Sequence, residues 1–245
     1  MAASPTSVLL GSGGIATEER REIYRDLVSQ HFRACNQVLF VSYASHDHSS
    51  YTSKMQDFLG AKGPTLVGIE SMDDSVSAIE EAEGIYVGGG NSFLLVRALH
   101  EKGLVKPIRD AVVGRGLPYL GVSAGANVAS PTIMTTNDMP ICLPPSFDSF
   151  GIVPFQINPH YHPGKINFLD GGDIVKHYGE SRAQRIAEYH RTNDTPVLGM
   201  WEGSFVQWDG SKGKLFGRAT SFRRGEEPSE IENHSEFTGD LVPVD

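Results

Sequence analysis

The sequence predicts an α/β fold in which helices flank a mostly parallel sheet. Short apolar runs alternate with helical patterns along the first half of the chain, and strands that alternate with helices form βαβ units. The predicted strands are Val8 to Leu10, Val38 to Tyr43, Thr65 to Ile69, Ile85 to Val87 and Tyr119 to Val122. Beyond Thr195, two apolar runs on either side of Asp209 and Gly210 predict an added C-terminal hairpin.

The first predicted helix runs from Thr17 to Phe32. Apolar residues recur at helical spacing from Ile23 to Val28, and Thr17 is followed by two glutamates that favour a helix start. Before this helix, residues 11–16 fit the G-x-G-x-x-A pattern of a dinucleotide-binding loop. The second predicted strand ends without the acid that would bind a ribose hydroxyl, so we interpret the glycines as a tight strand-to-helix turn, with nucleotide binding as the alternative.

The segment from Leu117 to Asn127 combines a short apolar strand, a Gly-x-Ser-x-Gly turn and a helix start. A serine hydroxyl is a weak nucleophile until a sharp turn presents it to a base. Small residues at Gly121 and Gly125 let neighbouring backbone approach that turn. The pattern therefore predicts Ser123 as a catalytic nucleophile, against the alternative of an ordinary turn serine.

Two histidines follow the apolar run from Ile152 to Ile157, where the carboxyl end of a strand contributes to sites in α/β folds. His160 is nearer the strand end than His162, and we expect it to be the base. His160 with His162, and His46 with His48, also form His-x-His pairs, but neither pair has a marked third ligand for zinc. We therefore expect no metal and no cofactor.

Glu202 lies in an otherwise apolar strand-turn-strand segment, where a lone acid is costly unless it is paired. An imidazole N–H is such a partner, so Glu202 is the predicted acid of a triad. The order Ser123, His160, Glu202 differs from the Ser, Asp/Glu, His order of α/β-hydrolases and argues against that fold.

Composition is that of one enzyme domain. The chain has 245 residues and no linker or repeat, which predicts a single domain over 1–225 and a charged, flexible tail over 226–245. A net charge of −9 argues against nucleic-acid binding. Two cysteines, no secretory leader and no run of membrane-spanning length predict a cytoplasmic protein without membrane association. The oligomeric state, monomer or dimer, stays open.

Several separated motifs resemble those of peptidase E, the α-aspartyl dipeptidase family of serine peptidases that is related to cyanophycinases. The matching blocks are Val87 to Asn91, Gly121 to Asn127, Thr135 to Pro140, Gln156 to His160, Arg182 to Ile186 and Gly199 to Gly203. Met200 and Trp201, before the glutamate, depart from the family pattern. The resemblance implies a fold like that of class I glutamine amidotransferases (flavodoxin-like) and a triad of Ser123, His160 and Glu202.

The resemblance also implies further site residues. Asp138 matches an acidic position that either joins the triad or supports the active-site loop, and Gly89 or Gly90 is expected to form the oxyanion hole with the N–H of Ala124. Arg182 matches the arginine that binds the substrate aspartate, a role that suits its planar fork. Arg185 and Lys165 are alternative cations.

The implied activity is hydrolysis of dipeptides with an N-terminal aspartate. The alternatives are a cyanophycinase-like or other acyl hydrolase on the same scaffold, and a non-catalytic protein that binds a small ligand.

Overall fold

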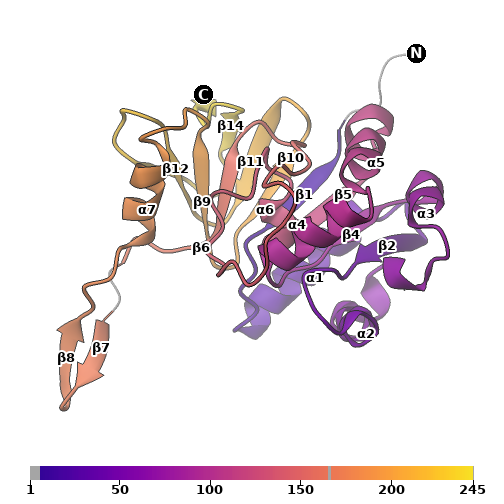
Figure 1. Ribbon diagram of the computed structural model, residues 1–245, viewed down its shortest axis with the longest axis horizontal. Helices are drawn as coiled ribbons and strands as arrows, with labels where there is room; N and C mark the ends of the chain where they lie inside the picture. The colour runs from indigo at the N-terminus through magenta and orange to yellow at the C-terminus, as the bar shows by residue number, and fades with distance from the viewer. Residues whose placement is uncertain (1–5, 165–166, 245) are drawn as a thin grey trace.

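The computed structural model describes residues 6–164 and 167–244. Within this part of the chain the main sheet has the strand order β15-β14-β11-β10-β1-β5-β4-β2-β3 (Figure 1). Its parallel half consists of β1 (Val8–Gly11), β2 (Gln37–Val41), β3 (Thr65–Gly68), β4 (Ile85–Val87) and β5 (Tyr119–Val122). The predicted α/β class with a mainly parallel sheet is confirmed.

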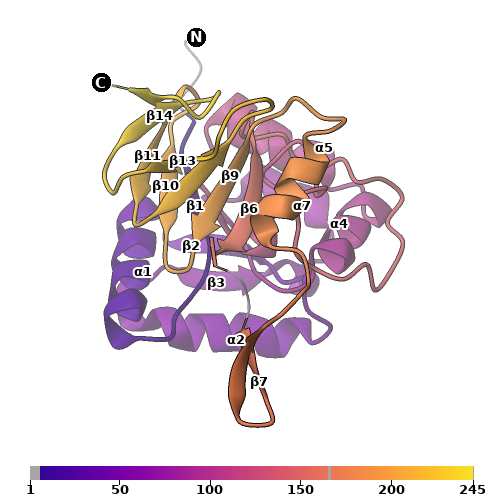
Figure 2. The same ribbon diagram turned by 90° about the vertical axis from the view of Figure 1, so that its left-hand side faces the viewer.

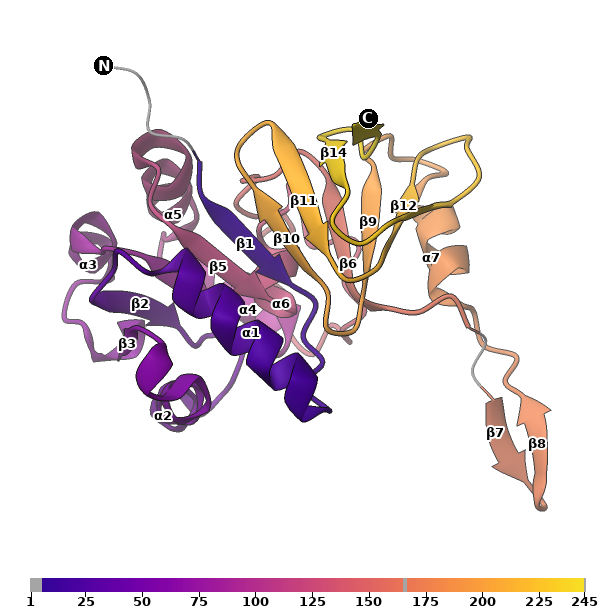
Figure 3. The same ribbon diagram turned by 180° about the vertical axis from the view of Figure 1, so that it is seen from behind.

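Helices pack on both faces of this parallel half, because its strands alternate their apolar side chains between two cores. Ile85 and Val87 of β4 face one core, and Tyr86 faces the other. On the first face lie α3 (Ser75–Glu81), α4 (Ser92–Glu101), α5 (Val105–Arg109) and α6 (Ala124–Asn127). On the second lie α1 (Glu18–His31), which runs across the sheet in Figure 3, and α2 (His48–Leu59). Short helical turns are η1 (Gly60–Lys62), η2 (Ile69–Ser71) and η3 (Asp110–Gly114).

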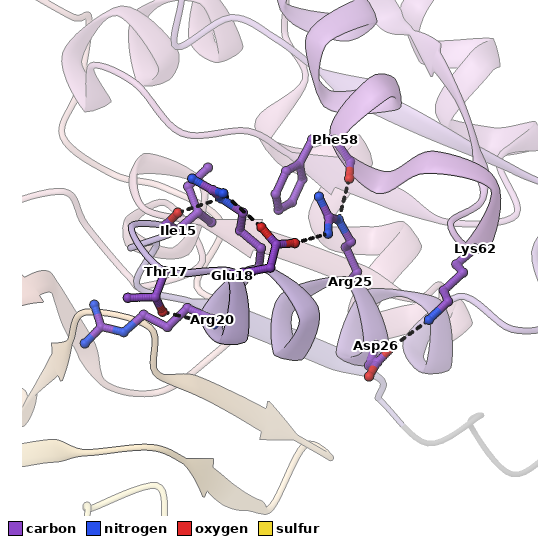
Figure 4. A network of polar contacts seen from close by, with 9 residues as sticks. Ile15, Thr17, Glu18, Arg20, Arg25, Asp26, Phe58 and Lys62 are labelled. Atoms are coloured by element: carbon purple, nitrogen blue, oxygen red, sulfur yellow. Dashed lines mark hydrogen bonds and ion pairs between the residues drawn. The ribbon is translucent and has the colours of Figure 1, made fainter.

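Helix α1 begins as predicted. The Thr17 hydroxyl accepts a hydrogen bond from Arg20 N at 3.3 Å and caps the helix (Figure 4). Glu18 in the first turn pairs with Arg25, whose Nε donates to the carbonyl of Phe58 at 2.8 Å. This contact fixes α1 against the end of α2.

The C-terminal half adds antiparallel strands. The predicted hairpin is present as β10 (Phe205–Trp208) and β11 (Lys212–Phe216), and β10 pairs antiparallel with β1. A second sheet that the sequence did not predict has the order β13-β12-β9-β6 (Figure 2). Its strands are β6 (Gln156–Tyr161), β9 (Val197–Trp201), β12 (Ala219–Phe222) and β13 (Ser229–Ile231). Helix α7 (Arg182–Tyr189) packs on it through Ile186.

The described residues of the segment 226–245, which the sequence predicts as a charged and flexible tail, contain three strands. These are β13, β14 (Glu236–Thr238) and β15 (Pro243–Val244), each paired within a sheet. Phe237 and Leu241 are fully buried. A few widely spaced apolar side chains thus anchor a segment whose charged composition predicted disorder.

A small hairpin, β7 (Asn167–Asp170) and β8 (Asp173–Lys176), extends away from the body between β6 and α7 (Figure 1). Most of its side chains are exposed. No helix within the described ranges is long and apolar enough to cross a membrane.

Candidate active site

Ser123 occupies the sharp turn between β5 and α6. Its backbone is left-handed, with φ 55° and ψ −111°, and its N–H donates to the carbonyl of Gly11 at 2.9 Å. A side chain at Gly121 would place its Cβ 2.2 Å from the carbonyl oxygen of Gly125, and one at Gly125 would place it 2.0 Å from that of Val87. Only glycine fits at these two positions, as the close approach predicted from the motif requires.

His160 reaches Ser123 from β6. Its Nε2 lies 2.8 Å from Ser123 Oγ. The pairing of β6 with β9 is irregular between Asn158 and Tyr161, and His160 at this irregularity has a left-handed φ of 56°. Such a conformation is strained for a residue with a Cβ, and it is found preferentially at functional sites. It turns the imidazole toward Ser123.

Glu202 follows the last residue of β9. Its Oε1 lies 2.7 Å from His160 Nδ1, so Ser123, His160 and Glu202 form one continuous hydrogen-bonded chain. The Glu202 side chain is 45% exposed and the His160 side chain 35%. Much of the Glu202 carboxylate is therefore open to solvent, and the cost of burying an unpaired acid is smaller here than the apolar sequence context predicted. Of the two departures from the family pattern, Met200 is buried in the core and Trp201 stacks against Arg218 at 3.8 Å.

Asp138 makes a different contact. Its Oδ2 accepts a hydrogen bond from the N–H of Ser92, the first residue of α4, at 2.7 Å. Asn91, the cap of α4, donates from Nδ2 to the carbonyl of Met139. These bonds tie the 138–139 loop to the start of α4, and Asp138 has no hydrogen bond to His160. The geometry favours the supporting interpretation of Asp138 over membership of the triad.

The loop of residues 88–91 lies against Ser123. A Cβ built on Gly89 would lie 3.1 Å from Ser123 Cβ. Burial raises the pKa of the Tyr51 hydroxyl, and a hydrogen bond with the Gly89 backbone opposes this rise. Gly90 has φ 136° and packs on the carbonyl of Ala44, and its N–H has no hydrogen bond to another described residue.

Arg182 is the first residue of α7, which begins with a capping box of Ser181 and Gln184. Its Nε is buried without a hydrogen-bond partner among the described residues. Burial and neighbouring Arg185 lower the pKa of the guanidinium, whereas the charges of Glu202 and Asp138 raise it. The guanidinium therefore lies within electrostatic reach of the triad acid.

A cavity of about 110 Å³ lies beside this arginine. Arg182, Arg185, His162 and Asn137 supply polar groups to its wall. The hydrogen bond of His162 is local, with its Nδ1 3.2 Å from the carbonyl oxygen of Gly164, whereas His160 is the histidine bonded to Ser123. Lys165, the other alternative cation, lies outside the described residues.

The family model described as Peptidase family S51 matches residues 7–216 of the chain. The chain belongs to peptidase family S51. The resemblance to peptidase E is therefore confirmed, and so is the expectation of a serine peptidase.

Individual relatives agree with this S51 assignment. A peptidase E of Streptomyces coelicolor is 44% identical over 208 residues, which cover 84% of this chain and 82% of that protein. A probable alpha-aspartyl dipeptidase of Drosophila melanogaster is 42% identical over 219 residues, which cover 89% and 88%. A crystal structure of a peptidase from an acI-B1 actinobacterium has a TM-score of 0.64 at 16% identity and covers 96% of this chain and 97% of that one. A putative peptidase E of Listeria monocytogenes has a TM-score of 0.55 at 20% identity, with coverage of 93% and 98%. These two structures share the fold.

Two sets of contacts in this S51 site were not predicted from the sequence. Asn158 donates from Nδ2 to the carbonyl of Thr135 and to Oδ1 of Asn137, and Asn137 donates to the carbonyl of Pro159. These bonds hold the 135–138 loop against β6. The motif blocks contained these positions, but nothing in their spacing indicated that they contact each other.

The second set is made by the glycine-rich turn after β1. A Cβ on Gly13 would lie 2.9 Å from His160 Cε1, and one on Gly14 would lie 2.3 Å from Glu202 Oε2. The turn thus packs on the side chains of His160 and Glu202. The tight-turn interpretation fits this arrangement.

Proposed function

We propose that this S51 peptidase is a serine dipeptidase that hydrolyses dipeptides with an N-terminal aspartate. The observation that carries the proposal is the chain of two hydrogen bonds from Ser123 through His160 to Glu202, at 2.8 and 2.7 Å. A serine beside a base that is itself oriented by a carboxylate is the arrangement that nucleophilic acyl transfer needs. The name of the Drosophila relative, a probable alpha-aspartyl dipeptidase, supports the choice of substrate.

In the first half-reaction, Ser123 Oγ attacks the carbonyl carbon of the aspartyl residue while His160 Nε2 accepts the hydroxyl proton. The charge of Glu202 stabilises the resulting imidazolium, and its hydrogen bond keeps the second ring proton on Nδ1. When the tetrahedral intermediate collapses, the C–N bond breaks and Nε2–H protonates the leaving amine. The second amino acid departs, and the aspartyl group remains as an ester on Ser123.

In the second half-reaction, water transfers a proton to His160 Nε2 and attacks the ester carbonyl. The C–O bond to Ser123 breaks, and Oγ recovers the proton from the imidazolium. Aspartate is released, and the triad returns to its starting state. We assign the two oxyanion donors to the N–H groups of Ala124, which begins α6, and Gly90. Gly89 is the less suitable of the two glycines because its backbone already has a hydrogen bond with the Tyr51 hydroxyl.

We assign recognition of the substrate side chain to Arg182. Its buried Nε lacks a partner within the described part of the chain, and a buried donor is costly until it is satisfied. A carboxylate satisfies an arginine fork with two parallel hydrogen bonds. The positive charge at this point also explains how a chain of net charge −9 can hold an acidic ligand.

The test is a panel of Asp-X, Glu-X, Asn-X, X-Asp and isoaspartyl dipeptides, each incubated with the parent and with S123A. We expect hydrolysis of Asp-X by the parent alone. Release of amino acids from isoaspartyl substrates in preference to Asp-X would favour a cyanophycinase-like activity. Binding of acidic dipeptides without any hydrolysis would favour a non-catalytic protein.

A further inference from the structure

The turn of residues Gly11 to Gly14 contacts the segments that carry all three members of the triad. The carbonyl of Gly11 accepts the hydrogen bond of Ser123 N at 2.9 Å, and the carbonyl of Gly13 accepts that of Gly203 N, next to Glu202, at 2.7 Å. Between them, Ser12 contacts the backbone of His160. These three triad segments are far apart in the sequence, and this one turn joins them.

The Ser12 side chain is fully buried and both of its hydrogen bonds are made to backbone. Its Oγ accepts from His160 N at 2.8 Å and donates to the carbonyl of Met200 at 2.9 Å. The irregular pairing of β6 with β9 between Asn158 and Tyr161 removes His160 from the regular ladder. The Ser12 hydroxyl therefore satisfies an N–H group that the strand pairing leaves free, at a residue whose φ of 56° is itself strained.

The two glycines that follow fit closely under the side chains of the triad. Gly13 has φ 101° and its Cα faces the His160 ring, and Gly14 has φ 85° and its Cα faces the Glu202 carboxylate. A methyl group at Gly14 would lie 2.3 Å from Glu202 Oε2 and 2.8 Å from Gly203 N. The absence of side chains at these positions leaves room for the imidazole and the carboxylate.

We propose that Ser12 is a positioning residue for catalysis: its hydroxyl holds the His160 backbone in the left-handed conformation that aims the imidazole at Ser123. Gly14 serves the same arrangement by leaving space for Glu202. This inference rests on the proposed function, and neither residue touches the substrate or the reacting atoms. A displacement of the base by about 1 Å is enough to lower turnover by about 100-fold.

The variants S12A and S12T test the hydroxyl, and S204A is the matched control. Ser204 is equally buried, and its Oγ also accepts from a backbone N–H and donates to a carbonyl, both of Arg218, without contacting the triad side chains. We expect kcat for Asp-X to fall about 10- to 100-fold in S12A with KM within about threefold of the parent. S12T keeps the hydroxyl and should recover most of the loss. S204A should lower Tm by about as much as S12A does, but it should keep the kcat of the parent.

A kcat for S12A within about threefold of the parent would overturn the proposal. So would an equal loss of kcat in S204A, because the effect would then reflect general loosening of the fold. The rate at which phenylmethanesulfonyl fluoride labels Ser123 is measured in the same variants. This rate depends on the base and not on the dipeptide, so slow labelling of S12A supports positioning even if the parent hydrolyses none of the panel, whereas labelling at the parent rate contradicts it.

The variant G14A tests the space under Glu202, with G103A as its control. Gly103 also has a left-handed backbone, φ 67°, but has open space where a Cβ would lie. We expect G14A to lower kcat about 10-fold or more and G103A to leave kcat unchanged. In the E202A background the same change at Gly14 should cost less than in the parent, because the contact with the Glu202 carboxylate is gone while the contact with Gly203 N remains. Equal losses in both backgrounds would contradict a role for the contact with Glu202.

Discussion

Replacement of Glu202 by glutamine isolates the contribution of its charge. The amide oxygen can still accept the hydrogen bond from His160 Nδ1, which is 2.7 Å long in the parent, so the ring orientation is kept. The lost interaction is the attraction between the carboxylate and the imidazolium that forms during each half-reaction. At a charge separation of about 4 Å this attraction is roughly 1 kcal/mol in water and 4 kcal/mol near a protein surface.

The exposure of the pair sets the expected range. The Glu202 side chain is 45% exposed and that of His160 is 35%. Solvent therefore screens the attraction in part, and its strength lies between the value in water and the value near a protein surface. Since each 1.4 kcal/mol is tenfold in rate, we expect E202Q to lower kcat by roughly 5- to 1,000-fold. The larger losses that follow from removing a buried triad acid, about 10,000-fold, are not expected here.

The assay compares kcat and KM for Asp-X in the parent, E202Q and D138N, with Tm measured alongside. Asp138 accepts a hydrogen bond from Ser92 N, and its negative charge stabilises the charged form of Arg182. We therefore expect D138N to lower Tm and to raise KM more than it lowers kcat. A greater loss of kcat in D138N than in E202Q would refute this reasoning and exchange the roles of the two acids.

Two further predictions concern substrate recognition by Arg182 and the effect of His31 on stability. R182A leaves the substrate carboxylate without its fork and should lower kcat/KM for Asp-X by about 100- to 1,000-fold, with R182K between it and the parent, because charged hydrogen bonds contribute roughly 1.5 to 3 kcal/mol each. Parent-like preference for Asp-X over Asn-X in R182A would assign recognition to another cation, such as Arg185. Burial lowers the pKa of His31 to about 4 against the opposing effect of its hydrogen bond to the Tyr119 carbonyl. Since the unfolded state takes up a proton first, the free energy of unfolding should fall by about 3 kcal/mol as the pH drops from 6.5 to 4. Urea denaturation of H31Q across this range should give a shallower pH dependence, and an unchanged one would contradict the assignment.

The parts of the fold that sequence predicted are those coded by local patterns. The five parallel strands and α1 were found because apolar spacing and the Thr17 cap act within a few residues of each other. The second sheet was missed because its strands pair across long separations, as β9 does with β12 and β6. Short strands such as β13 carry too little apolar pattern to be recognised before their partners are known.

The same difference between local and long-range signals applies to the candidate site. Ser123 is marked by a local turn motif, and His160 by its place near a strand end. The support of the triad by Ser12 was not visible, because the hydrogen bond from His160 N to Ser12 Oγ joins residues 148 positions apart. The G-x-G-x-x-A pattern drew attention to this turn for phosphate binding, whereas its glycines are needed for the close packing of His160 and Glu202.

The most direct test of the account is the covalent intermediate. An Asp-X substrate with a good leaving group is mixed rapidly with the parent, the reaction is quenched in acid, and the protein is digested and mapped by mass spectrometry. We predict a peptide containing Ser123 whose mass is raised by one aspartyl residue, and its absence in S123A. Turnover of the substrate without any adduct, or an adduct on a different residue, would contradict Ser123 as the nucleophile.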